Sequence, residues 1–259
     1  MKIAKILSLG ILSIIAWTAS WLLLEQIIYQ NKLDWIGWAS GATVLGIIFL
    51  AFFFLVNKNQ IIAGVCNVII FISYVLTMPK DLYVMIGGII FLIFSFLFQH
   101  RILSEEKSRH DFVMHRVMSG SITLLVYALM LLIGFNIYHH SVKNLNTSLD
   151  AYYDRLARTA TKAVPYVTQG FPEIPEQQKQ QVAGELAIQA VNRIKQSAEA
   201  YQQYFPLVYA LIITGLLWSF AFLLRWVTVI LGWLIFRILL TIKFFRLAKA
   251  QVEVQKLEI

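Results

Sequence analysis

Residues Ile36 to Val56 read IGWASGATVLGIIFLAFFFLV, twenty-one positions without one ionisable side chain. A helix needs roughly 20 residues to cross a hydrocarbon core about 30 Å thick, so this run is long enough for one crossing. Comparable runs recur along the chain: Ile6 to Leu24, Ile61 to Met78, Leu82 to Phe98, Val117 to Tyr138, Leu207 to Leu224 and Trp226 to Ile242. The repetition predicts an all-α, polytopic helical membrane protein.

The composition agrees with a bilayer as the main solvent. Of the 259 residues, 59% are hydrophobic and only 14% are charged, with a mean hydropathy of +0.69, which a soluble domain of this size cannot keep off its surface. The formal net charge of +8 lies beside the apolar runs, where cytoplasmic retention and anionic lipid explain it better than nucleic acid does. Cys66 is the one cysteine, so no intrachain disulfide can form.

The positions of the basic residues predict the orientation. Lys2 and Lys5 precede the first apolar run, which we interpret as an uncleaved span rather than a signal peptide. With the N-terminus in the cytoplasm, the outer connectors carry only Lys32 and Lys80, as the positive-inside rule requires. The remaining basic residues near the first five spans then stay inside: Lys2, Lys5, Lys58, Arg101, Lys107, Arg109 and Arg116.

The last two apolar runs are separated only by Arg225, and two helices cannot fold back on each other through one residue. We therefore expect six spans, with Trp226 to Ile242 continuing the sixth helix as a kinked, interfacial or re-entrant segment. A seventh crossing is the alternative, and it would export Arg237, Lys243, Arg246 and Lys249 against the charge rule.

The predicted organisation has four parts. Residues 1–138 form five spans with a cytoplasmic loop at 99–116, residues 139–204 form an extracytoplasmic module, residues 205–247 hold the sixth span with the apolar segment after it, and residues 248–259 form a cytoplasmic tail. The tail has apolar residues at alternate positions from Val252 to Ile259, a pattern that permits a short strand.

The module at 139–204 has the periodicity of two amphipathic helices. Apolar residues recur at intervals of three and four in each half, and Gly170, Pro172 and Pro175 lie between the halves. An antiparallel helical hairpin is therefore predicted, whose apolar stripe is available to a second copy of the chain or to another envelope protein. The interaction residues predicted on this stripe are Leu145, Leu149, Tyr152, Leu156, Val191, Ile194 and Tyr201.

Histidines and carboxylates gather between residues 99 and 116. If that loop is helical, Asp111 and His115 share a face, and the spacing of His110 and His115 is similar to that in histidine boxes of membrane fatty-acid desaturases. Those enzymes carry further boxes of the His-x-x-His-His type on the same side, whereas His139 and His140 fall on the opposite side of the predicted topology. His110, Asp111 and His115 are therefore only weak candidates for metal ligands.

Few polar residues lie inside the predicted spans. Gly37 and Gly41 form a small-x-x-x-small pattern that predicts close helix packing, while Asn67 and Asn136 are the only amides within spans and favour interhelical hydrogen bonding. Arg225 is expected near the inner end of a helix. Walker, dinucleotide-binding, nucleophile-elbow and metal-type cysteine motifs are absent from the sequence.

These features favour a non-enzymatic scaffold or interaction protein of a bacterial-type cytoplasmic membrane, without a cofactor, whose hairpin self-associates or binds an envelope partner. One alternative is a channel or carrier for an uncharged or hydrophobic solute, lined by Asn67 and Asn136. The other is a metal-dependent lipid-modifying enzyme that uses the histidine-rich loop.

Overall fold

The computed structural model is all-helical, with 93% of its residues in helices and no strand in the part that it describes. The backbone is described for residues 2–57, 59–107, 114–168, 185, 189–197 and 201–245, and the side chains for 3–57, 59–105, 117–145, 185, 189–197 and 201–245. The predicted turn at 169–175 and the predicted strand pattern at 252–259 lie outside these residues. The all-α class predicted from the sequence is confirmed.

Six helices are long and apolar enough to cross a membrane. In chain order the elements are α1 (Lys2–Gln30), η1 (Leu33–Trp35), α2 (Ile36–Val56), α3 (Gln60–Thr77), α4 (Leu82–Lys107), α5 (Met114–Thr168), η2 (Gln202–Tyr204) and α7 (Phe205–Thr241). Residues 189–197 are also helical.

The first helix is longer than its apolar run. A polar turn was expected from Glu25 onward, but α1 continues to Gln30 and ends where Asn31 adopts a left-handed backbone with φ of 54°. The amide of Lys32 then donates to the carbonyl of Gln26 at 3.2 Å, which satisfies one of the carbonyls left open at the helix end. The helix therefore stops at the residue that tolerates this conformation, not at the first charge.

The expected loop at 99–116 is also shorter in the structure. Helix α4 continues through Arg101 and Glu105 to Lys107, and α5 begins at Met114. Residues 99–107 contain no glycine or proline and are rich in Gln, Arg, Glu and Lys, which favour helices. Charge alone therefore does not interrupt α4.

The two last apolar runs belong to one helix. Helix α7 is continuous from Phe205 to Thr241, and Arg225 lies inside it. This continuity is the interpretation that the sequence favoured, and the described residues contain no separate seventh spanning helix. Arg225 lies inside this helix and sixteen helical residues follow it, so the helix does not end at the charge.

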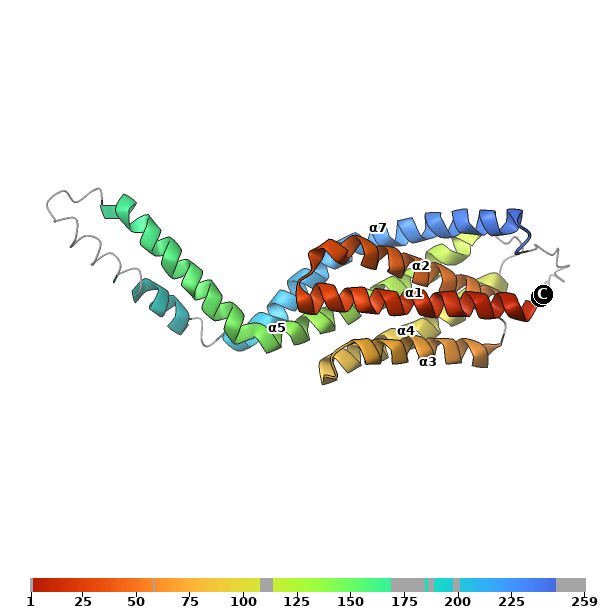
Figure 1. Ribbon diagram of the computed structural model, residues 1–259, viewed down its shortest axis with the longest axis horizontal. Helices are drawn as coiled ribbons and strands as arrows, with labels where there is room; N and C mark the ends of the chain where they lie inside the picture. The colour runs from red at the N-terminus through yellow and green to blue at the C-terminus, as the bar shows by residue number, and fades with distance from the viewer. Residues whose placement is uncertain are drawn as a thin grey trace, which may run out of the picture. The chain divides into compact units, whose positions relative to one another are not determined.

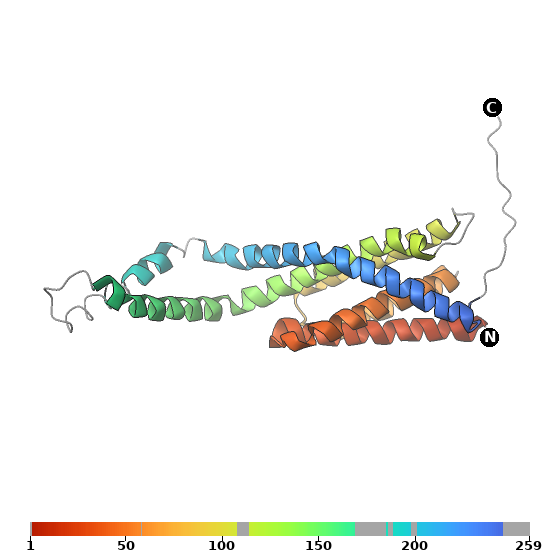
Figure 2. The ribbon, with the colours of Figure 1, turned by 90° about the horizontal axis from the view of Figure 1, so that it is seen from above.

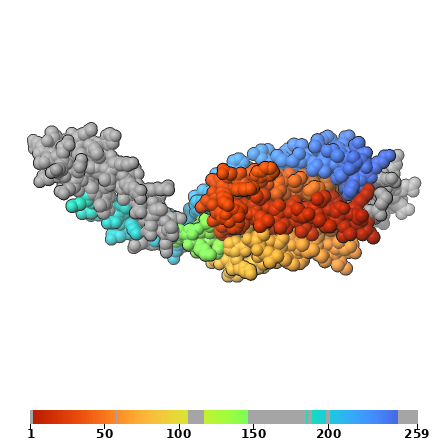
Figure 3. Space-filling model, viewed as in Figure 1, coloured from red at the N-terminus to blue at the C-terminus, as the bar shows by residue number. Residues whose placement is uncertain are grey.

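The chain divides into two compact units, Met1–Ile137 with Ile213–Ile259 and Tyr138–Ile212. In the first unit, α1 and α2 run side by side, as do α3 and α4 (Figures 1 and 2). In the space-filling view, α1 and α2 form the middle of the visible face of this unit, with α7 along one side and α3 along the other (Figure 3). We call this unit the bundle.

Aromatic side chains fill the centre of the bundle. Trp17 and Trp21 stack with ring centroids 4.9 Å apart, and the ring of Phe91 meets both edge-on, at 5.0 and 5.3 Å. Gly46 makes room for Trp17, because a Cβ at this position would lie 3.2 Å from the indole. Burial of large rings at such geometries contributes strongly to packing, so these contacts hold α1, α2 and α4 together.

The first and last helices of the bundle meet at one end. Nζ of Lys5 in α1 donates to the carbonyls of Lys243 and Phe244, just after α7, and lies 4.7 Å from the centroid of the Phe244 ring. A cation at a helix C-terminus is stabilised by the unpaired carbonyls and by the helix dipole. The start of α1 and the end of α7 therefore lie at the same end of the bundle.

Candidate functional site

The residues predicted to form the apolar stripe of the hairpin are described only in part. Leu145 is half-buried in α5, whereas the side chains of Leu149, Tyr152 and Leu156 lie outside the described set, although their backbone is helical. In the second half of the predicted module, Val191 is 8% exposed, Ile194 is 48% exposed and Tyr201 is 66% exposed. One apolar side chain is thus covered within its unit, and two are open.

The histidine-rich cluster cannot be followed as a site. His110 and Asp111 are outside the described residues, and His115 is described only as backbone at the start of α5. Among the side chains that are described, no three His, Cys, Asp or Glu residues are placed to hold a metal ion.

The glycines of the small-x-x-x-small pattern do not pack against a neighbouring helix of this chain. A Cβ built on Gly37 or Gly41 would meet no described atom within 4 Å, and both residues are exposed. The expected packing role is therefore not found within the described residues. The closest approaches occur at other glycines, because the rotation of each helix, not the spacing alone, decides which face meets a neighbour: Gly88 against Tyr74, Gly134 against Thr214 and Gly232 against Met118.

Asn136 joins three helices through hydrogen bonds. Its Nδ2 donates to the hydroxyl of Tyr74 in α3 at 2.9 Å, and its Oδ1 accepts from the hydroxyl of Tyr29 in α1 at 2.9 Å. The Tyr74 hydroxyl in turn donates to the carbonyl of Val84 in α4 at 2.9 Å. Asn136 is fully buried, so its amide is already occupied by protein partners.

Asn67 forms a second buried polar group between α3 and α4. Ser95 donates to its Oδ1 at 2.7 Å, and its Nδ2 donates to Oε1 of Gln99 at 3.4 Å. Asn67, Ser95 and Gln99 are all buried, with exposures of 1%, 2% and 7%. Both span amides thus make interhelical hydrogen bonds.

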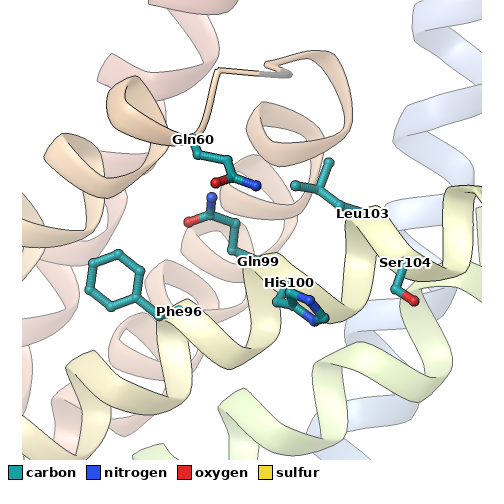
Figure 4. Close-up of a pocket in the computed structure, with 6 residues that line it drawn as sticks. All are labelled: Gln60, Phe96, Gln99, His100, Leu103 and Ser104. Atoms are coloured by element: carbon teal, nitrogen blue, oxygen red, sulfur yellow. The ribbon is translucent and has the colours of Figure 1, made fainter.

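Gln99 also lines a pocket at the ends of α3 and α4, with a volume of about 490 Å³. Figure 4 shows the side chains of Gln60 and Gln99 extending toward one another, with His100 and Ser104 on the next turns of α4. The remaining lining residues are Phe96 and Leu103. The pocket therefore offers amides, a hydroxyl and an imidazole at the rim of the bundle.

This pocket does not have the geometry of a hydrolytic site. A serine nucleophile needs a base within about 2.6–3.2 Å, and His100 and Ser104 share no hydrogen bond in the described part of the chain. Neither Gln60 nor Gln99 can act as a general acid or base. The described side chains of this pocket thus contain no hydrogen-bonded nucleophile–base pair.

Arg225 is a further candidate functional residue, and it lies inside α7. Its Nη2 donates to Oγ of Ser119 in α5 at 2.8 Å, and the side chain is half-buried. The sequence contained the signal, since Arg225 and Arg237 are the charged residues between Leu207 and Ile242, but the division into two runs hid the position of Arg225 inside one helix. A charge inside an apolar helix is costly and marks a functional site more often than a structural one.

No protein-family model, curated protein or solved structure matches this chain. The site residues therefore rest on the chain's own geometry.

Proposed function

We propose that this chain is an integral protein of a bacterial-type cytoplasmic membrane, with six spans and both termini in the cytoplasm. The six apolar helices support this proposal, and so does the outer surface of the bundle, which exposes large apolar side chains. Such surface is unfavourable in water and favourable in lipid. Examples are Ile61 at 78%, Leu76 at 75% and Trp38 at 72% exposure.

The orientation follows from the two ends of the bundle. The contact of Lys5 with the end of α7 supports an even number of crossings, since the first and last spans then start and end on one side. That side also holds Arg101 and Lys243, whereas Lys32 and Lys80 at the other end are accompanied by Asp34 and Asp81. The positive-inside rule then puts the end with Lys5 in the cytoplasm.

Within that membrane, we assign the chain a non-enzymatic role as a scaffold or interaction protein. The observation that carries this role is the length of α5, whose 55 residues span about 82 Å at 1.5 Å per residue. A hydrocarbon core of about 30 Å holds at most a fraction of such a helix. The rest of α5 would lie in the extracytoplasmic space together with residues 189–197.

A partner would bind the exposed apolar residues of the extracytoplasmic module at 139–204. Ile194 and Tyr201 are open while Val191 is covered, so the segment keeps apolar surface beyond what its own unit buries. Either a second copy of the chain or another envelope protein would remove this surface from water. The channel alternative receives less support, because Asn67 and Asn136 are hydrogen-bonded to neighbouring helices.

A photo-crosslinking amino acid placed singly at Ile194, Tyr201 or Leu33 tests this role in native membranes. Leu33 is the matched control, because it is an apolar residue with 65% exposure at the outer end of the bundle. We expect discrete adducts from Ile194 and Tyr201, either of doubled mass or with one partner protein, and none of the same mass from Leu33. Equal adducts from all three positions, or none from Ile194 and Tyr201, would reject the interaction role.

A further inference from the structure

Arg225 keeps a full charge in the interior of an apolar helix. It lies twenty residues after the first residue of α7 and sixteen before the last. A guanidinium does not lose its proton in proteins, so it cannot lower the cost of burial by becoming neutral. It needs hydrogen-bond acceptors or an anion instead.

The described residues meet this need only in part. A guanidinium has five N–H donors, and one bond from Arg225 is formed, to the Ser119 hydroxyl. No described carboxylate makes an ion pair with Arg225. Ser119 is the sixth residue of α5, so the guanidinium reaches a level about 7.5 Å from the first residue of that helix.

A second guanidinium approaches the same turn of α5 from α4. Nη2 of Arg101 would lie 3.6 Å from a Cβ built on Gly120, the residue next to Ser119. This distance is an ordinary van der Waals contact, so Arg101 lies directly beside Gly120. Oε1 of Glu105 would lie 3.8 Å from the same Cβ, so one guanidinium and one carboxylate lie beside Gly120, while the Arg225 guanidinium bonds to the neighbouring Ser119.

We propose that the surface around the Ser119–Gly120 turn binds the phosphate of an anionic phospholipid headgroup through Arg225 and Arg101. Guanidinium groups bind phosphate oxygens with charge-assisted, often bidentate hydrogen bonds. Basic sites between spans on the cytoplasmic side recognise such headgroups, and the short distance from Ser119 to the start of α5 brings a headgroup within reach. This inference rests on the proposed membrane insertion and not on the interaction role of the hairpin.

Lipid binding to the purified full-length protein in detergent tests the site. Native mass spectrometry with phosphatidylglycerol and with phosphatidylcholine measures the preference for the anionic lipid, and inorganic phosphate is added as a competitor. We expect the wild type to prefer phosphatidylglycerol by about tenfold or more, the worth of one or two charged hydrogen bonds. Displacement by inorganic phosphate at low concentration would instead identify a soluble phosphate as the ligand and overturn the lipid assignment.

Three variants and one control assign the preference to these residues. Arg225→Gln and Arg101→Gln should each remove most of the preference, and Glu105→Gln should increase it, because the carboxylate repels the phosphate. Arg237→Gln is the control, since Arg237 lies on the same helix, is exposed and has its guanidinium 5.2 Å from the Trp233 ring. It should leave the preference unchanged.

The result remains decisive if Arg225→Gln does not fold, because Arg101 is exposed and its substitution removes the second guanidinium without opening the bundle. Equal affinity of the wild type for both lipids would overturn the proposal, as would an equal loss in Arg237→Gln and Arg101→Gln. Crosslinking through Ile194 is independent of these measurements, so failure of the lipid site is distinguishable from failure of the interaction role.

Discussion

The amide of Asn136 donates a hydrogen bond of 2.9 Å to the hydroxyl of Tyr74, which lies 62 positions earlier in the chain. Through this bond α5 is joined to α3, and the Tyr29 and Val84 contacts extend the connection to α1 and α4. Four helices thus share one buried polar group, in which Asn136 and Tyr74 are 0% and 1% exposed.

Replacing Asn136 with leucine is expected to destabilise the purified protein by about 1–2 kcal/mol, because the hydrogen bonds between Asn136 and the hydroxyls of Tyr74 and Tyr29 are lost. Thermal unfolding in detergent measures the change. A double-mutant cycle with Tyr74→Phe should show coupling between the two residues. Ser219→Ala serves as the control, since Ser219 bonds only to a carbonyl of its own helix, that of Gly215. Strictly additive effects would show that the Asn136–Tyr74 bond is not formed.

Position 88 is expected not to accommodate the methyl side chain of alanine in place of Gly88. A Cβ there would lie 2.6 Å from Cε1 of Tyr74, and that ring is held by the hydrogen bonds of its hydroxyl. Gly88→Ala should therefore cost about 1–3 kcal/mol, the usual range for overpacking. Gly41→Ala is the matched substitution, because it meets open space and should leave the unfolding temperature unchanged or slightly raised. If both variants unfold alike, the packing of α3 on α4 differs from that described.

Removing the ammonium of Lys5 should loosen the end of α7. Lys5→Met loses two carbonyl contacts and the contact with the Phe244 ring, which together contribute about 0.5–1 kcal/mol. Lys80→Met removes an exposed lysine for which the described residues offer no such partner. A lower unfolding temperature for Lys5→Met alone is the expected result, and equal shifts would argue against the contact.

Single cysteines in a Cys66→Ala background separate six crossings from seven. A membrane-impermeant maleimide added to intact cells should label Lys32→Cys, which lies in the predicted outer connector. Ser104→Cys and Thr241→Cys are exposed at the opposite end and should react only after permeabilisation. Labelling of Thr241→Cys together with Lys32→Cys would require an odd number of crossings.

The apolar runs predicted the existence and order of the six long helices, because the requirement to satisfy backbone groups inside a membrane leaves few other structures. Their ends were less predictable. Asn31 ends α1 through a left-handed conformation that polarity at Glu25 did not indicate. Similarly, the charged residues after Gln99 remain helical because no residue there breaks the helix.

The site depends on information that a single sequence does not contain. Gly37 and Gly88 look equally able to admit a neighbour, but only the rotation of each helix in the bundle decides that Gly88 meets Tyr74. In the sequence, Arg225 separates two apolar runs and looks like a boundary. Its hydrogen-bond partner Ser119 lies 106 positions away, so the contact cannot be recognised from the sequence. The hairpin role stays a prediction, because the turn between its two helices and the side chains of Leu149, Tyr152 and Leu156 fall outside the described residues.

The contact between Lys5 and the carbonyls after α7 joins two segments that lie 238 and 239 positions apart in the sequence. Until the residues near position 244 have been synthesised, α1 has no partner for its ammonium group at that end. Closure of this end of the bundle therefore requires the residues just after α7, and a chain truncated before them would leave α1 without this contact.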